Sequence, residues 1–173
     1  ESLLGLLRQT VKVNKPMPAG IALRIVLDAL HGLHAAHELK GDLGEPLNLV
    51  HRDVSPHNIL VGVDGVARIV DFGIARAEER IGTTRDGQVK GKLAYGAPEQ
   101  FIGQPVDRRA DIFSVGVMMW EALARRRRRF ADTPAATFGA LMTRPLRIRE
   151  VAPECPELLA AVCDRAVSVD PDE

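Results

Sequence analysis

One stretch of the chain, Leu49–Ala77, constrains the fold most strongly, because it places polar residues on both sides of a predicted β-hairpin. The hairpin is indicated by two short apolar runs joined at an Asp-Gly pair, a dipeptide typical of tight two-residue turns. Asp53 and Asn58 share the loop before the hairpin, and Asp71 follows it. Since hairpin strands run side by side, the two acids and the amide are expected at one cleft.

The rest of the chain is predicted to be mainly α-helical. Apolar residues at helical spacing predict an amphipathic helix over 19–39, and a nearly uniform apolar stretch over 111–124 predicts a helix buried at the centre of the fold. The expected elements are helices at 2–8, 19–39 and 111–124, two or three more from residue 134 onward with the last at 156–167, and strands at 49–50, 59–63 and 66–70.

Four short motifs follow one another in the chain: HRDxxxxN at 51–58, DFG at 71–73, APE at 97–99 and DxxSxG at 111–116. In this order and with these gaps, they resemble the C-terminal lobe of a eukaryotic-type protein kinase, of the bacterial serine/threonine type. The resemblance implies a mainly α-helical lobe with small β-hairpins at the cleft. It also implies transfer of the γ-phosphate of ATP to a Ser or Thr hydroxyl of a protein substrate.

The first two motifs carry the chemistry that this resemblance implies. Asp53 would accept or orient the proton of the attacking hydroxyl, with His51 and Arg52 beside it in the same motif. Asn58 and Asp71 would supply hard oxygen ligands to Mg²⁺, the ion that bridges the nucleotide phosphates. Catalysis would then rest on positioning and charge neutralisation more than on covalent chemistry.

Four further residues would support this site, again by resemblance. Phe72 would pack beside the metal ligand, Gly73 would permit the turn after it, and Leu60 would form the apolar floor beneath adenine. Asp111 would hydrogen-bond the backbone of the HRD loop and anchor it to the buried helix. A role of Asp111 as a helix N-cap is compatible with this contact.

The residues between the DFG and APE motifs would form the activation segment. Thr83 and Thr84 are its candidates for phosphorylation, and a phosphate there would pair with Arg52 through charge-assisted hydrogen bonds. Glu99 of the APE motif would pair with an Arg near the end of the lobe, expected just past the last residue of the sequence.

Two positions depart from the kinase pattern. Ser55 stands where serine/threonine kinases usually carry a Lys that neutralises the transferred phosphate. Lys92 stands where those kinases usually have a Thr that contacts the catalytic Asp. One hypothesis is that Lys92 folds toward Asp53 and replaces the missing cation, and the other is that it is exposed and the enzyme is weaker.

No Gly-rich phosphate loop and no strand Lys of the V-A-I-K type occur in the sequence. We therefore expect residues 1–173 to be a partial kinase domain, truncated at both ends, with the N-terminal lobe absent. Such a fragment would bind nucleotide poorly and would not turn over by itself.

Three other functions stay open. A pseudokinase or interaction module is favoured by Ser55 and the missing lobe, and disfavoured by the intact Asp53, Asn58 and Asp71. A small-molecule phosphotransferase of the aminoglycoside or choline kinase type carries a similar HxDxxxxN loop but lacks the APE and DxxSxG motifs. The third possibility is a non-functional gene remnant.

The kinase resemblance implies protein substrates and ATP as partners, and composition argues against two other classes of partner. The formal net charge is zero, which argues against a nucleic-acid partner, and no apolar run approaches the roughly 20 residues that span a membrane. Cys155 and Cys163 are expected to stay reduced in the cytoplasm. His31, His34 and His37 lack the neighbouring Cys or carboxylates of a metal site and are expected to be core or surface residues.

Overall fold

The computed structural model describes residues 1–72, 94–126, 136, 139–140, 143 and 146–172. Within these residues the fold is mostly helical, with one small two-stranded sheet. The elements are α1 (Leu3–Lys12), α2 (Ala19–His37), β1 (Ile59–Val61), β2 (Ala67–Ile69), α4 (Glu99–Ile102), α5 (Arg109–Ala124), α7 (Ile148–Val151) and α8 (Glu157–Ala166).

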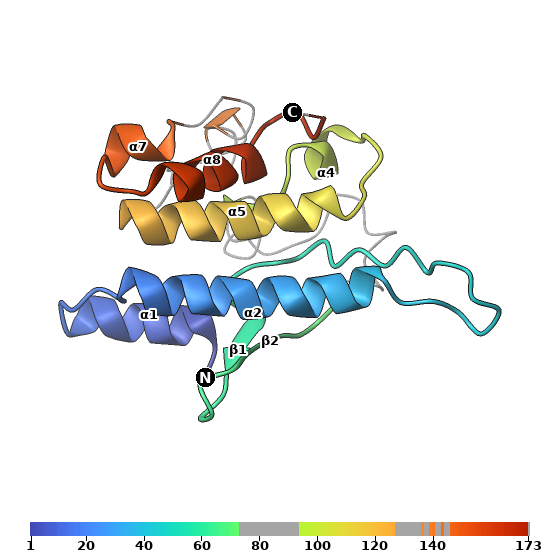
Figure 1. Cartoon of the computed structure of the whole chain (residues 1–173), viewed down its shortest axis with the longest axis horizontal. Coiled ribbons are helices and arrows are strands. Elements are labelled where there is room, and N and C mark those ends of the chain that lie inside the picture. Colours follow the sequence, from blue (N-terminus) through green and yellow to red (C-terminus); the bar gives the residue numbers. More distant parts are fainter. Residues whose placement is uncertain (73–93, 127–135, 137–138, 141–142, 144–145, 173) are drawn as a thin grey trace.

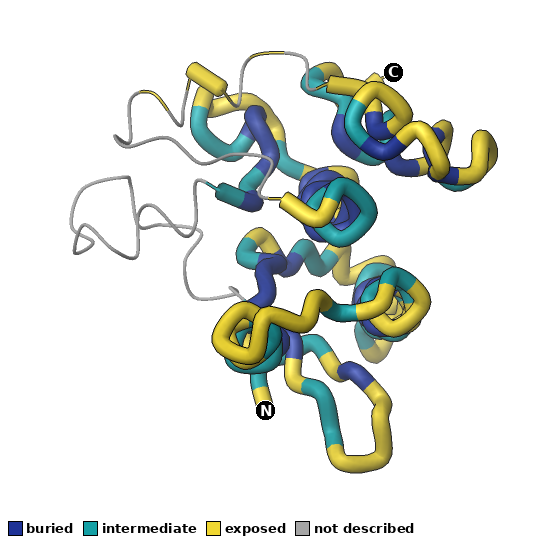
Figure 2. Tube along the Cα trace, turned by 90° about the vertical axis from the view of Figure 1, so that its left-hand side faces the viewer, coloured by how far each residue is buried: buried dark blue, intermediate teal, exposed yellow. Residues whose placement is uncertain are grey.

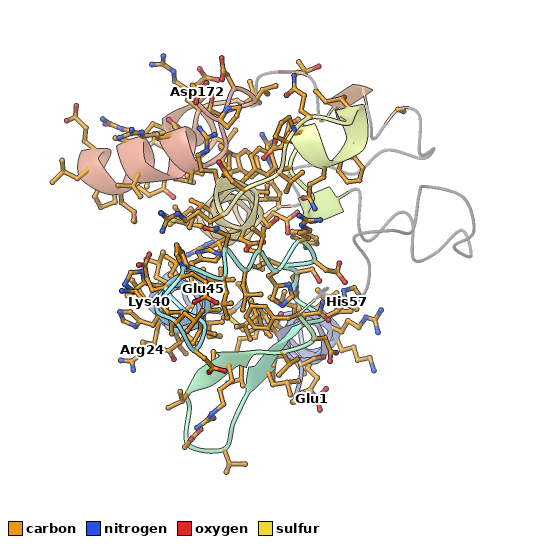
Figure 3. All side chains as sticks on the ribbon, turned by 90° about the vertical axis from the view of Figure 1, so that its right-hand side faces the viewer. Glu1, Arg24, Lys40, Glu45, His57 and Asp172 are labelled. Carbon is orange, nitrogen blue, oxygen red and sulfur yellow. The ribbon has the colours of Figure 1, made fainter. Side chains whose placement is uncertain are left out.

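The long helices lie in successive layers (Figure 1). The β1–β2 hairpin and α1 form one end of the molecule, α2 covers them, and α5 runs beside α2. The short helices α4 and α7 lie with α8 beyond α5. Figure 3 shows Glu1 and Arg24 at the end that holds the hairpin, and Asp172 at the opposite end.

The helix α5 is the centre of the core, as its uniformly apolar sequence predicts. Ten of its sixteen residues are buried, because α2 packs on one side of it and α7 and α8 on the other (Figure 2). Gly116 allows the approach of α8: a Cβ at this position would lie 2.7 Å from the Cβ of Ala166. On the facing helix α2, the buried residues follow helical spacing and are Ile25, Val26, Ala29, Leu33 and Ala36.

The hairpin is antiparallel, with Ile59 opposite Ile69. Its strands are shorter than predicted, because the ladder ends where the chain turns through the Asp-Gly pair. The helix α2 holds the second strand in place: the Asp28 carboxylate accepts a hydrogen bond from the backbone amide of Ala67, with 3.0 Å between Oδ2 and N. The hairpin therefore has a defined position on α2. Because loop 51–58 leads into the hairpin and Asp71 follows it, the positions of both depend on this contact.

Two expected boundaries differ from the structure. Residues 49–50 are not a strand, because no strand lies alongside them in the described part of the chain. The first helix continues to Lys12, beyond the predicted end at residue 8, because Ser2 caps its start and Lys12 interacts favourably with the dipole at its last turn. The N-terminal residue Glu1 and β1 also exchange a backbone hydrogen bond, from Val61 N to Glu1 O.

By length and composition, α2 is long and apolar enough to cross a membrane, although the sequence predicted no membrane span. The core helix of a folded domain passes the same test. In this fold α2 packs against α5 and β2, and five of its residues are buried there. Its length and apolar content are therefore weak evidence for a membrane segment.

Candidate active site

The loop 51–58 is anchored to α5 by one buried carboxylate. Asp111, which is fully buried, accepts hydrogen bonds from the backbone amides of His51 and Arg52, both at 2.8 Å. The same carboxylate also accepts a hydrogen bond from Nε2 of His37, at 2.8 Å. Asp111 is the third residue of α5 and Arg108 is the N-cap, so the additional N-cap role predicted for Asp111 is wrong.

His51 connects this loop to the end of the hairpin. Its ring is fully buried, and Nε2 lies 2.9 Å from the carbonyl oxygen of Val70 while Nδ1 lies 3.3 Å from the amide of Asp53. Since the Val70 carbonyl can only accept, Nε2 carries the proton and Nδ1 is the acceptor. The ring of Phe72 tilts against the same imidazole, with 4.5 Å between the ring centroids.

Asp53 and Asn58 are joined directly. The Asn58 side-chain amide donates to the Asp53 carbonyl oxygen at 2.8 Å and to its carboxylate at 3.2 Å. The backbone carbonyl of Asn58 accepts from the amide of Val70 at 2.9 Å, so the chain enters Asp71 beside Asn58. The structure thus brings together the two acids and the amide that the sequence analysis singled out, with Asp71 exposed to solvent.

Two residues of the site have a left-handed backbone. The φ angles are +65° at Arg52 and +60° at Asp71. Asp adopts this region several times more readily than most residues, but for Arg it costs roughly 1–2 kcal/mol. Such a conformation persists only where surrounding contacts hold it, and at Arg52 the Asp111 carboxylate supplies one of these contacts.

Two residues that sequence reasoning missed take part in this arrangement. His37 bonds Asp111, and the signal was its place on the buried face of α2, one turn beyond Leu33. Gln100 donates from Nε2 to the backbone carbonyl of Arg52 at 2.8 Å. No local pattern predicts the Gln100 contact, because its partner is 48 residues away in the sequence.

Ser55 and Leu60 occupy different surroundings. Ser55 is buried, with 6% of its surface exposed, and its backbone carbonyl accepts from the amide of Asn58 in a tight turn. Leu60 lies on β1 opposite Arg68 and is 42% exposed. The Ser55 hydroxyl is therefore enclosed by the fold, whereas the Leu60 side chain is available for contact.

Glu99 begins α4 and is buried, with 7% of its surface exposed. Burial raises the pKa of its carboxyl group above 4.5, and Asp107 raises it further. Among the described residues no salt bridge involves Glu99, although Arg109 lies near enough to favour its charge weakly. Glu99 lines a pocket of about 900 Å³ together with Arg147, Asp164 and Arg165.

Four predicted site residues, Gly73, Thr83, Thr84 and Lys92, lie outside the described residues. The described part of the chain contains no cluster of three His, Cys, Asp or Glu side chains that could hold a metal ion. Cys155 and Cys163 are both buried, and neither forms a disulfide within the part of the chain that the structure describes.

Comparison with known proteins assigns the family. The sequence model of the protein kinase domain matches residues 2–165. The tyrosine-protein kinase MasK of Myxococcus xanthus is 45% identical over 158 residues, which is 91% of this chain and 24% of that protein. The serine/threonine-protein kinase PknA of Corynebacterium glutamicum is 34% identical over 161 residues, which is 93% of this chain and 30% of that protein.

A third relative, the serine/threonine-protein kinase PknL of Mycobacterium tuberculosis, is 39% identical over 119 residues, covering 69% of this chain and 28% of that protein. The chain thus spans about a quarter to a third of the length of these curated relatives. Because the family model covers nearly the whole sequence and three bacterial kinases match most of it, the chain belongs to the protein kinase family, among relatives that are bacterial kinases of the eukaryotic type.

Proposed function

We propose that the protein containing this chain transfers the γ-phosphate of ATP to Ser or Thr hydroxyls of protein substrates. The proposal rests on one observation: Asn58 contacts Asp53 directly and holds the strand that leads into Asp71. The Asn58 amide reaches the Asp53 carboxylate at 3.2 Å, and its backbone carbonyl holds the strand that leads into Asp71. A base and two hard oxygen ligands close together are the groups that phosphoryl transfer uses.

Each of these residues has a chemical role in the proposal. Asp53 accepts or orients the proton of the attacking hydroxyl, and the Asn58 amide keeps its carboxylate in place. Because Nδ2 of Asn58 is used by Asp53, its Oδ1 is the atom left to bind a cation. The exposed Asp71 carboxylate is the second ligand, and the pair fits Mg²⁺, which would neutralise charge on the phosphates of ATP.

The choice of Ser or Thr as acceptor is supported by the names of most relatives. PknA and PknL are named serine/threonine kinases, whereas MasK is named a tyrosine kinase. Phosphoamino-acid analysis of a phosphorylated generic protein substrate would decide the matter. Phosphoserine or phosphothreonine would support the proposal, and phosphotyrosine alone would contradict this part of it.

We further propose that residues 1–173 do not turn over without a nucleotide-binding lobe. The proposal rests on the sequence, which contains neither a Gly-rich phosphate loop nor a strand Lys of the V-A-I-K type. The decisive experiment measures phosphate transfer from Mg-ATP by this chain and by the protein expressed from its complete natural gene. Each preparation is compared with its Asp53→Asn variant.

We expect transfer by the complete protein, and loss of about a hundredfold or more of it in the Asp53→Asn variant. Transfer that survives this substitution would contradict the role of Asp53. Transfer by the 173-residue chain alone would contradict the need for a further lobe. If the complete protein transfers no phosphate, the assignment of an active kinase fails.

The burial of Ser55 favours a second candidate, a pseudokinase that acts through binding. A buried hydroxyl cannot neutralise the transferred phosphate as the usual Lys does, so turnover depends on another cation. We propose Lys92 for that role. If Lys92→Ala lowers turnover, the compensation is supported, whereas unchanged turnover would exclude it. Nucleotide binding without any transfer would favour the pseudokinase.

The family match to protein kinases makes a small-molecule phosphotransferase the weakest candidate.

A further inference from the structure

The backbone of Arg52 is held at both of its ends by side chains from other segments. The Arg52 amide donates to Oδ1 of Asp111 at 2.8 Å, and the Arg52 carbonyl accepts from Nε2 of Gln100 at 2.8 Å. These two partners come from different segments, α5 and α4. The left-handed φ of +65° at Arg52 is thus set by one contact at each end of the residue.

The Asp53 backbone is held in the same manner. Its amide donates to Nδ1 of His51 at 3.3 Å, and its carbonyl accepts from Nδ2 of Asn58 at 2.8 Å. Both of these partners belong to the loop itself. Within the described residues, Gln100 ties the backbone beside Asp53 to the helix α4, which begins in the APE motif.

The orientation of the Gln100 amide is itself determined. Its Oε1 accepts from the backbone amide of Ala97 at 2.9 Å, and Ala97 is fully buried. Because a backbone N–H can only donate, Oε1 must face Ala97 and Nε2 must face the Arg52 carbonyl. The Gln100 side chain therefore joins the backbone of Ala97 to the backbone of Arg52 through two hydrogen bonds.

We infer that Gln100 is a positioning residue for phosphoryl transfer. It acts through the Arg52 carbonyl to set the direction in which the Asp53 carboxylate points. Without the Gln100 contact, one of the two hydrogen bonds that hold the left-handed backbone of Arg52 is lost. The peptide between Arg52 and Asp53 can then rotate toward a relaxed conformation. Small displacements of a catalytic group reduce the rate without removing substrate binding. This inference rests on the proposed function.

The test uses the protein expressed from its complete natural gene. Gln100→Glu keeps the acceptor for Ala97 and removes the donor to the Arg52 carbonyl, and Gln100→Leu removes both. The matched control is Gln104→Glu, which makes the same charge change at an exposed glutamine near the end of α4. Turnover, KM for ATP, KM for a protein substrate and hydrogen exchange over residues 51–58 are measured for all four proteins.

We expect kcat to fall about tenfold to a hundredfold in Gln100→Glu and Gln100→Leu, with both KM values within about twofold of the parent. Exchange over 51–58 is expected to accelerate in both variants, and Gln104→Glu is expected to match the parent in every measurement. An unchanged kcat in both Gln100 variants would overturn the inference, as would a rise in KM for the protein substrate with kcat unchanged.

The two proposals fail in different ways. If the parent protein transfers no phosphate, the proposed function fails, and hydrogen exchange alone decides the positioning. In that case, accelerated exchange over residues 51–58 in Gln100→Glu, absent in Gln104→Glu, would still support the role of Gln100. Unchanged exchange would overturn it. A merely structural role would lower the thermal midpoint while kcat per folded molecule stayed at the parental value.

Discussion

His37 and Asp111 are 74 residues apart in the sequence, and Nε2 of the imidazole lies 2.8 Å from Oδ2 of the carboxylate. The two side chains are 5% and 0% exposed, so the contact is shielded from water. It joins the end of α2 to the start of α5 at the point where Asp111 also holds the 51–58 loop. The position of that loop therefore depends on the packing of two helices.

The first prediction concerns this contact. His37→Ala should lower the free energy of unfolding by about 1–3 kcal/mol, because a buried carboxylate oxygen loses a donor. His37→Gln, whose Nε2 can reach a similar position, should recover part of the loss. The measurement is urea unfolding, and His34→Ala is the control because His34 is exposed on the same helix. Equal effects of His34→Ala and His37→Ala would contradict the prediction.

The second prediction concerns the packing of α5 on α8. Gly116→Ala should destabilise the fold by about 1–3 kcal/mol, since the new Cβ would lie 2.7 Å from the Cβ of Ala166. Gly20→Ala is the matched control in α2, where no atom lies within 4 Å of the added Cβ. That change should stabilise the fold by up to about 1 kcal/mol. Thermal unfolding of both variants tests the pair, and a neutral Gly116→Ala would show that α8 can shift freely.

The third prediction concerns the attachment of the hairpin. The Ala67 amide and Arg24 hold the pKa of Asp28 below its usual value. A lowered carboxyl pKa stabilises the folded state above pH 3.8, and this contribution is lost as the pH falls through the lowered pKa. Asp28→Ala should therefore speed hydrogen exchange over residues 59–69 at neutral pH. Asp28→Asn, which keeps an acceptor, should do so less.

Arg24→Ala serves as the control for Asp28. It removes an ion pair whose Arg side chain is 68% exposed but leaves the hydrogen bond to Ala67. Exchange in the hairpin should hardly change. If Arg24→Ala loosened the hairpin as much as Asp28→Ala, the ion pair rather than the hydrogen bond would be responsible.

The fourth prediction concerns Glu99, whose carboxyl pKa is raised by burial. The folded state then binds the proton more tightly than the unfolded state does. Stability is therefore lost as the pH rises from about 4.5 through the raised pKa. Glu99→Gln should make the 173-residue chain more stable than the parent near pH 7, with the difference shrinking toward pH 4.5. Denaturant unfolding at several pH values measures it, and a destabilised variant at pH 7 would indicate a cationic partner beyond the described residues.

The fifth prediction concerns the proposed phosphorylation of Thr83 or Thr84. A phosphate on either residue would form charge-assisted hydrogen bonds with Arg52, which is exposed beside Asp53. After incubation with ATP, the Thr83→Ala/Thr84→Ala double variant of the complete protein should be less active than the parent treated in the same way. Phosphopeptide mapping of the parent identifies the modified residue. Unchanged activity in the double variant would rule out this regulation.

The sequence predicted the helices well where one face is buried. The apolar spacing over 19–39 and the uniform apolar run over 111–124 appear as α2 and α5, because these patterns match the burial that each helix finds. The Asp-Gly pair likewise marked the hairpin turn. Predictions were less accurate at element ends and at 49–50, because a strand needs a partner that its own sequence does not specify.

By itself, the sequence determined the family and the local order of Asp53, Asn58 and Asp71, since motif spacing and turn chemistry act over a few residues. The kinase resemblance also predicted the contact of Asp111 with the loop backbone. Only the tertiary structure revealed the other contacts, in which His37, Gln100 and Asp28 each reach a backbone or side-chain group of a distant segment. Such contacts depend on how α2, α4 and α5 pack, and that packing is set by burial over the whole core rather than by any local pattern.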